Sequence, residues 1–205
     1  MKTHTKETQS QLTPDGAKQL LIEGNDRFVA GKMAERNLMD QVNDTIDGQF
    51  PHSAILSCID SRTSSELIFD QGIGDVFNAR VAGNIVNEDV LGSLEYSCKV
   101  AGSKLLLVLG HSKCGAVTAA CKNVEMGNIT ALLSKVKPAI SKVSSSVDDI
   151  TAPDAVQKVA DQNVMHAIDE IRNKSQVLAE LEKNGEIKIL GGMYDIETGK
   201  VSFFE

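Results

Sequence analysis

The chain has 205 residues, enough for one well-buried domain. Its net charge of −7, without any Lys/Arg block, argues against nucleic acid or an anionic membrane as the main partner. No apolar run reaches the roughly 18 residues that span a bilayer, and the polar start "MKTHTKETQSQLTPDG" lacks a signal-peptide core. The sequence therefore predicts a cytoplasmic protein, or a periplasmic one if an export signal has been removed.

The first half of the chain predicts an N-terminal arm, a helix and then an alternation of strands and helices. Residues 1–13 are expected to be a polar arm, mobile or draped on a partner, and residues 14–205 a single α/β domain. Apolar residues at roughly helical spacing predict a helix over 14–36. The runs "HSAILSCID" (52–60) and "DVFNARVAG" (75–83) read as strands, and "SSELIFDQG" (64–72) between them as a short helix.

The second half continues this alternation. A helix is predicted at "NEDVLGSLEYSCKVAG" (87–102), a buried strand at "KLLLVLGHS" (104–112) and a helix at "KCGAVTAACKNVEMG" (113–127). Residues 129–183 read as two or three helical pieces, and 185–205 as a strand, a turn and a final strand. We therefore predict an α/β fold with about four parallel strands plus a C-terminal antiparallel edge strand, flanked by helices.

Two predicted strands end in reactive side chains. The first ends at Cys58, and the third leads into "GHSKCG", which contains His111 and Cys114. Ligands of open parallel sheets gather beyond the carboxyl ends of the strands, so these three side chains converge if the two strands are neighbours. Two thiolates and one imidazole form a zinc ligand set, and a catalytic zinc with three protein ligands keeps a fourth position for water or substrate. Cys114 also opens a helix, whose dipole favours the thiolate.

Simpler interpretations exist for each residue alone. A cysteine at the end of a strand is usually core, and neither HxxC nor CxDxR is specific by itself. Cys98 and Cys121 lie at helical spacing from apolar residues and are expected to be core. His166 is expected to be structural, and His52, just before the first strand, to be exposed. The combination of both motifs at the ends of two buried strands is what favours a shared metal site.

At these residues the sequence resembles the bacterial β-class carbonic anhydrases. The resemblance rests on "CIDSR" and "GHSKCG", and it extends through "FNARVAGN", "SLEYS" and "GGMYDIETGKV". It implies one Zn²⁺ per chain on Cys58, His111 and Cys114. It also implies reversible hydration of carbon dioxide to bicarbonate and a proton.

The resemblance further implies that Asp60 and Arg62 work as a pair. Asp60 lies near the open position of the metal, and Arg62 can hold its carboxylate by a bidentate contact. Asp60 could accept a hydrogen bond from the reacting hydroxide, whereas unpaired it could swing onto the zinc and close the site. Because two thiolates cancel the charge of the ion, the bound water should be hard to deprotonate. The active form is therefore expected to gain population above neutral pH.

Matching motifs suggest further substrate-binding residues. Gln49 lies nine residues before Cys58, as does a substrate-binding glutamine in the plant-like branch of the family. Phe77 and Tyr96 match pocket positions that a dimer partner could contribute, and the backbone N–H of Gly115 could donate to bicarbonate. A bacterial branch with an inhibitory bicarbonate pocket has tryptophan three residues before the first zinc cysteine. Here that residue is Ile55, so the pocket is expected to be incomplete although Arg80 retains its arginine position.

The resemblance implies a homo-oligomer, either a dimer or a tetramer built from dimers. Three rival functions remain at this stage. The chain could hydrolyse a related heterocumulene such as carbon disulfide, or be a non-catalytic zinc or bicarbonate-binding protein. It could also be a metal-free thiol enzyme, with Cys114 as the nucleophile and His111 as the base.

Overall fold

The computed structural model describes residues 2–204, and its centre is a five-stranded sheet in the order β2-β1-β3-β4-β5. The first four strands in that order are parallel, and β5 is antiparallel to β4. This confirms the predicted sheet. The strands are β1 (Ser53–Ser57), β2 (Val76–Arg80), β3 (Leu105–His111), β4 (Lys188–Tyr194) and β5 (Val201–Phe204).

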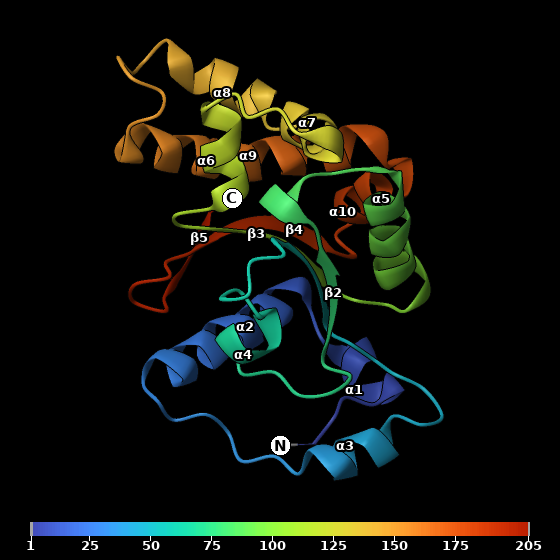
Figure 1. Cartoon of the computed structure of the whole chain (residues 1–205). Coiled ribbons are helices and arrows are strands. Elements are labelled where there is room, and N and C mark those ends of the chain that lie inside the picture. The colour runs from blue at the N-terminus through green and yellow to red at the C-terminus, as the bar shows by residue number, and fades with distance from the viewer. Residues whose placement is uncertain (1, 205) are drawn as a thin grey trace.

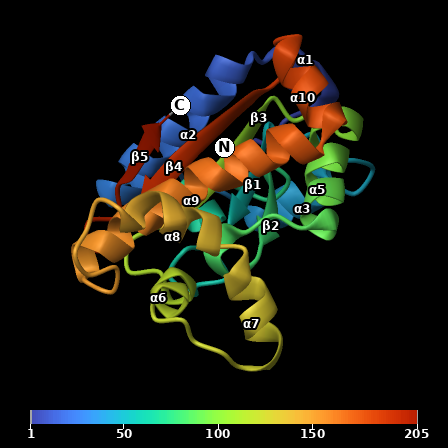
Figure 2. The same cartoon turned by 90° about the horizontal axis from the view of Figure 1, so that it is seen from above.

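Helices cover both faces of the sheet (Figure 1). On one side lie α1 (Lys6–Gln11), α2 (Pro14–Val29), α3 (Leu38–Asp44) and α4 (Ser65–Ile68). On the other lie α5 (Glu88–Glu95), α6 (Gly115–Cys121), α7 (Gly127–Ser134), α8 (Lys137–Ser144), α9 (Pro153–Lys174) and α10 (Gln176–Lys183). Seen from above, α9 crosses the sheet with α8 beside it (Figure 2). Within residues 2–204, no helix is both long and apolar enough to cross a bilayer.

The central strand β3 is buried on both faces, which explains its continuous apolar sequence. Leu105, Leu107 and Leu109 pack with residues of α2 and α4 on one face. Leu106 and Val108 pack with residues of α5, α9 and α10 on the other. A separate apolar cluster joins Cys58 and Cys114 to α6, α8 and α9, so the ends of β1 and β3 are supported by a packed layer of helices.

The helix boundaries differ from the sequence expectation at several places, and α6 ends at Cys121 rather than near 127. The helix predicted over 14–36 ends at Val29, and α3 follows in a segment where no element was predicted. The side chain of Asn37 accepts hydrogen bonds from two backbone N–H groups of α3 and so caps it. The region 129–183 contains four helices rather than two or three, because a further break occurs at Ser175, between α9 and α10.

The N-terminal arm contains α1, and that helix packs on its own chain. Gln9 is buried, and its Nε2 donates to the backbone oxygens of Pro51 and Ala101, each at 2.8 Å. The arm is therefore tied to the start of β1 and to the end of the helix that precedes β3.

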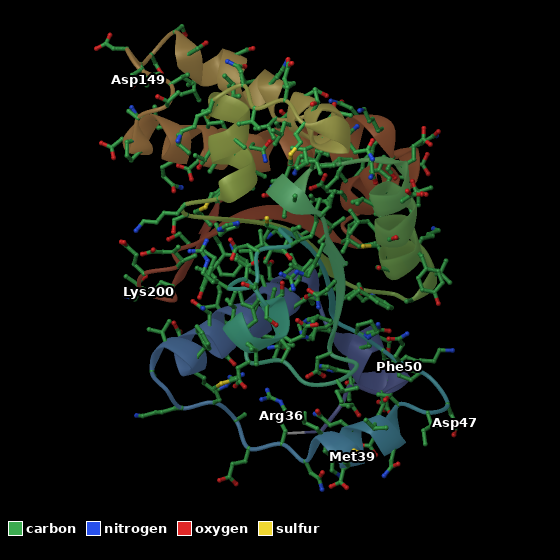
Figure 3. The ribbon with its side chains drawn as sticks, viewed as in Figure 1. Arg36, Met39, Asp47, Phe50, Asp149 and Lys200 are labelled. Carbon is green, nitrogen blue, oxygen red and sulfur yellow. The ribbon has the colours of Figure 1, made fainter. Side chains whose placement is uncertain are left out.

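The segment between α2 and α3 is held by the buried carboxylate of Asp70. Arg27 Nε and the Ala34 N–H donate to its Oδ2 at 2.5 and 3.0 Å, and Arg36 pairs with Oδ1. Burial raises the pKa of Asp70, but the hydrogen bonds from Arg36 and Arg27 outweigh it and hold the pKa below its usual range. Figure 3 shows Arg36 in this segment, Met39 in α3, and Asp47 and Phe50 in the stretch that leads from α3 to β1.

His52 is fully buried, so the expectation that it is exposed was wrong. Its Nδ1 lies 2.7 Å from Ser53 Oγ and its Nε2 lies 2.9 Å from Gln71 Oε1. The ring of His4, from the arm, covers it edge-on at 5.4 Å. Burial is the main reason that the pKa of His52 is lowered to about 4.

The buried His52 should make the stability of the protein depend on pH. An unfolded histidine titrates near pH 6.5, whereas His52 in the folded chain titrates near 4. Its contribution is fully present above the unfolded pKa and is lost as pH falls towards 4, by up to about 3 kcal/mol. Urea unfolding at fixed protein concentration should show a shallower loss between pH 6.5 and 4 for His52→Gln. Equal slopes for both proteins would contradict this.

Candidate metal centre and active site

The topology brings Cys58, His111 and Cys114 together. Strands β1 and β3 are parallel neighbours with Ser57 opposite Leu109, so Cys58 lies beside the end of β3, where His111 is the last residue. Cys114 is the N-cap residue of α6. One ligand atom from each of the three side chains lies within 4.8 Å of the other two, and all three residues are buried. No second group of three such side chains occurs among residues 2–204.

His111 has one ring nitrogen with a partner and one without. Its Nδ1 lies 2.9 Å from the Ser112 carbonyl oxygen, so Nδ1 carries the hydrogen and donates it. Its Nε2 is buried and has no hydrogen-bond partner. A buried polar atom without a partner calls for an explanation, and a metal ion between this nitrogen and the two thiols supplies one. Two sulfur ligands and one imidazole suit zinc.

The side chains of Cys58 and Cys114 are close enough to share one proton. The hydrogen bond from Cys114 is the largest cause that lowers the pKa of Cys58 to about 4, and the backbone N–H of Gly83 adds to it. The pKa of Cys114 is raised, first by this bond to Cys58 and then by burial. The pair therefore carries one negative charge near neutral pH, and a bound cation would favour loss of the second proton. Burial alone raises the pKa of Cys98 to about 12, as expected for a core thiol.

Asp60 and Arg62 form a bidentate ion pair beside this cluster. Arg62 Nε donates to Asp60 Oδ1 at 2.9 Å, and Nη2 donates to Oδ2 at 2.7 Å. The Arg62 side chain is the main reason that the pKa of Asp60 lies well below its usual range. Asp60 is therefore an ionised acceptor at any pH near neutral. It is half-buried, whereas Arg62 is exposed.

Arg80 holds the backbone of the loop that carries Asp60. Its Nε donates to the Cys58 carbonyl at 2.9 Å and its Nη2 to the Asp60 carbonyl at 2.7 Å. Thr63 Oγ1 donates to the same Asp60 oxygen at 2.9 Å. Sequence reasoning missed this role of Arg80 in holding the loop.

Ile55, where the inhibited branch has tryptophan, is fully buried in β1. The absence of an inhibitory bicarbonate pocket stays a prediction.

Three predicted substrate residues do not meet the cluster within one chain. Gln49 is exposed and lies before the start of β1, whereas Cys58 follows its end. Phe77 pairs with Ala54, near the start of β1. The rings of Phe77 and Tyr96 are 6.1 Å apart and line an open cavity of about 580 Å³. Gly115 does lie at the cluster, as the first residue of α6 directly after Cys114.

Comparisons with known proteins agree with this arrangement. A sequence profile described as carbonic anhydrase matches residues 53–201. The chain belongs to the β-class carbonic anhydrase family. Carbonic anhydrase 2 of Mycobacterium tuberculosis is 34% identical to it over 193 residues, which are 91% of each protein. The family predicted from the two motifs is thus confirmed.

Solved β-carbonic anhydrases share the fold. A Coccomyxa β-carbonic anhydrase in complex with acetazolamide superposes with a TM-score of 0.72 at 26% identity, covering 89% of this chain and 83% of that one. A tetrameric β-carbonic anhydrase from Sordaria macrospora superposes with a TM-score of 0.75 at 24% identity, covering 91% and 96%. This second likeness concerns the fold alone.

Proposed function

We propose that this β-class carbonic anhydrase binds one Zn²⁺ per chain at Cys58, His111 and Cys114 and catalyses the reversible hydration of carbon dioxide to bicarbonate and a proton. The observation that carries the proposal is the buried, unpartnered Nε2 of His111 within reach of two thiols. The ion pair of Asp60 and Arg62 next to this cluster supports catalysis rather than a purely structural site, which would use a fourth protein ligand.

The protein groups have separable roles in this reaction. Zinc in such a site lowers the pKa of a water ligand towards neutral pH. Asp60, held ionised by Arg62, accepts a hydrogen bond from the reacting water and directs its lone pair at carbon dioxide. Arg62 keeps the carboxylate away from the metal position by engaging both of its oxygens. The Gly115 N–H, at the start of α6, donates to an oxygen of bicarbonate.

The test is stopped-flow hydration of carbon dioxide between about pH 6.5 and 9, on protein of known zinc content. We expect activity that scales with zinc and rises with pH, because two thiolates make the reacting water a weaker acid than three imidazoles do. Carbon disulfide hydrolysis should be assayed on the same samples. A fully loaded protein that hydrates no carbon dioxide at any pH would overturn the proposal, and turnover of carbon disulfide would then favour the rival substrate.

We also propose that a second copy of the chain completes the site. Gln49 and Phe77 lie at the opposite end of β1 from Cys58, and Tyr96 packs against Phe77, so another subunit would have to bring them to its zinc. Helix α3 and the turn after it support a self-association surface, because large apolar side chains are exposed there. They are Leu38 at 53%, Met39 at 65%, Val42 at 38% and Ile46 at 72%.

Mixing two defective variants tests the shared site. Gln49→Ala and Cys58→Ser each damage both sites of a symmetric dimer, but a mixed dimer has one site with all residues intact. After random exchange of subunits in an equal mixture, about half of the dimers are mixed, and each of these has one intact site. The mixture should therefore show roughly a quarter of wild-type activity in addition to the residual activity of the two variants. Mixing Cys58→Ser with His111→Ala is the matched control, since that mixed dimer contains no intact site. The absence of any gain in the first mixture would rule out sharing through Gln49.

A further inference from the structure

Cys58 accepts a hydrogen bond from a backbone amide that a second residue holds in place. The Gly83 N–H donates to Cys58 Sγ at 3.4 Å. Gly83 lies in the short turn Ala82–Asn84 after β2, with φ at +70°. Glycine adopts this left-handed conformation at the least cost, and it is also the residue with the most backbone freedom. The direction of this N–H therefore depends on what fixes the turn.

Asn163 holds the carbonyl group of Gly83 in place. Its Nδ2 donates to the Gly83 carbonyl oxygen at 2.8 Å, and the residue is 2% exposed. Asn163 lies in the interior of α9 between the buried residues Ala160 and Val164. Asparagine is a poor helix former, and a buried amide is costly unless it is bonded. This hydrogen bond is a specific reason for an amide at that position.

We propose that Asn163 is a positioning residue for the zinc site, acting through Gly83 on the Cys58 thiolate. By holding the Gly83 carbonyl, it limits rotation of the glycine and keeps the amide aimed at Cys58 Sγ. The N–H group stabilises charge on the sulfur and orients the lone pair left for the metal. Partners of this kind typically change metal affinity or activity by 10–100-fold. The inference rests on the proposed zinc site.

The first test is release of zinc from the full-length protein to an excess of chelator. Asn163→Leu removes the amide at nearly constant volume, and we expect zinc release to be about 10-fold faster. Asn25→Leu is the matched control. Asn25 is also buried on a helix and donates to two backbone oxygens, of Ile68 and Gly199, but it does not contact the cluster. This control should lower stability and leave zinc release unchanged.

Cobalt substitution gives a readout that stability alone would not move. A thiolate that loses a hydrogen bond holds its lone pairs at higher energy. The thiolate-to-cobalt absorption of Asn163→Leu should therefore shift to longer wavelength, while that of Asn25→Leu should not. Wild-type release kinetics together with a wild-type cobalt spectrum in Asn163→Leu would overturn the proposal.

Wild-type protein provides a second measurement if Asn163→Leu fails to fold. With NMR-active cadmium in place of zinc, a scalar coupling should appear between the metal and the amide proton of Gly83, transmitted through the N–H···S bond. Its absence would remove the basis of the inference while leaving the zinc site intact. Failure of wild-type protein to bind either metal would instead refute the proposed function, so the two failures are distinguishable.

Discussion

Replacing Cys58 by serine is expected to abolish zinc retention and with it catalysis. The serine hydroxyl does not ionise near neutral pH, so the site keeps one thiol and one imidazole. Carbon dioxide hydration should fall at least about 10³-fold, since enzymes exceed uncatalysed rates by 10⁶-fold or more. Metal content after dialysis and stopped-flow hydration check both expectations.

Cys98→Ala is the control for that experiment. Cys98 is 5% exposed and packs in the main core against α9 and α10, away from the cluster. This variant should retain stoichiometric zinc and near wild-type activity, with a modest loss of stability. If Cys58→Ser retained zinc as well as Cys98→Ala does, the ligand set would be wrong.

Replacing Asp60 by asparagine is expected to remove activity while zinc remains bound. The amide keeps the shape of the side chain, but it carries no negative charge to pair with the guanidinium of Arg62. A positioned acid or base typically contributes 10²–10⁴-fold, so kcat should fall by about that factor. Loss of zinc in Asp60→Asn would show instead that Asp60 supports the metal site.

Arg62→Lys separates charge from orientation at this pair. Without the guanidinium, the pKa of Asp60 would rise towards the ordinary value near 4, so the carboxylate would still be ionised at pH 7. A lysine restores positive charge but not the two-point contact. Any loss of kcat in this variant at pH 7 therefore comes from misorientation of Asp60. Wild-type kcat would show that the bidentate geometry is unnecessary.

The sequence predicted the sheet from local pattern, and it predicted the convergence of three side chains on the condition that the first and third strands are neighbours. The apolar run of β3 and the alternation of strands with helices identify a parallel sheet, and ligand residues at two strand ends identify its functional edge. Features that depend on distant partners were not predictable. Asn163 contacts Gly83 across 80 positions of sequence. His52 was expected to be exposed at the start of the first strand, but His4 and Gln71 cover it.

The parallel pairing of β1 with β3 also bears on how the protein folds. All of β2, α4 and α5 lie in the sequence between Cys58 and His111, so these two side chains meet only after a long loop has closed. Long-range pairing of this kind is slow, and an unfolded chain has no preformed pocket for a metal. Metal capture should therefore be a late event in folding, after the central strands have paired. A captured ion would join two strand ends and a helix start, and it would act as a removable crosslink at the carboxyl edge of the sheet.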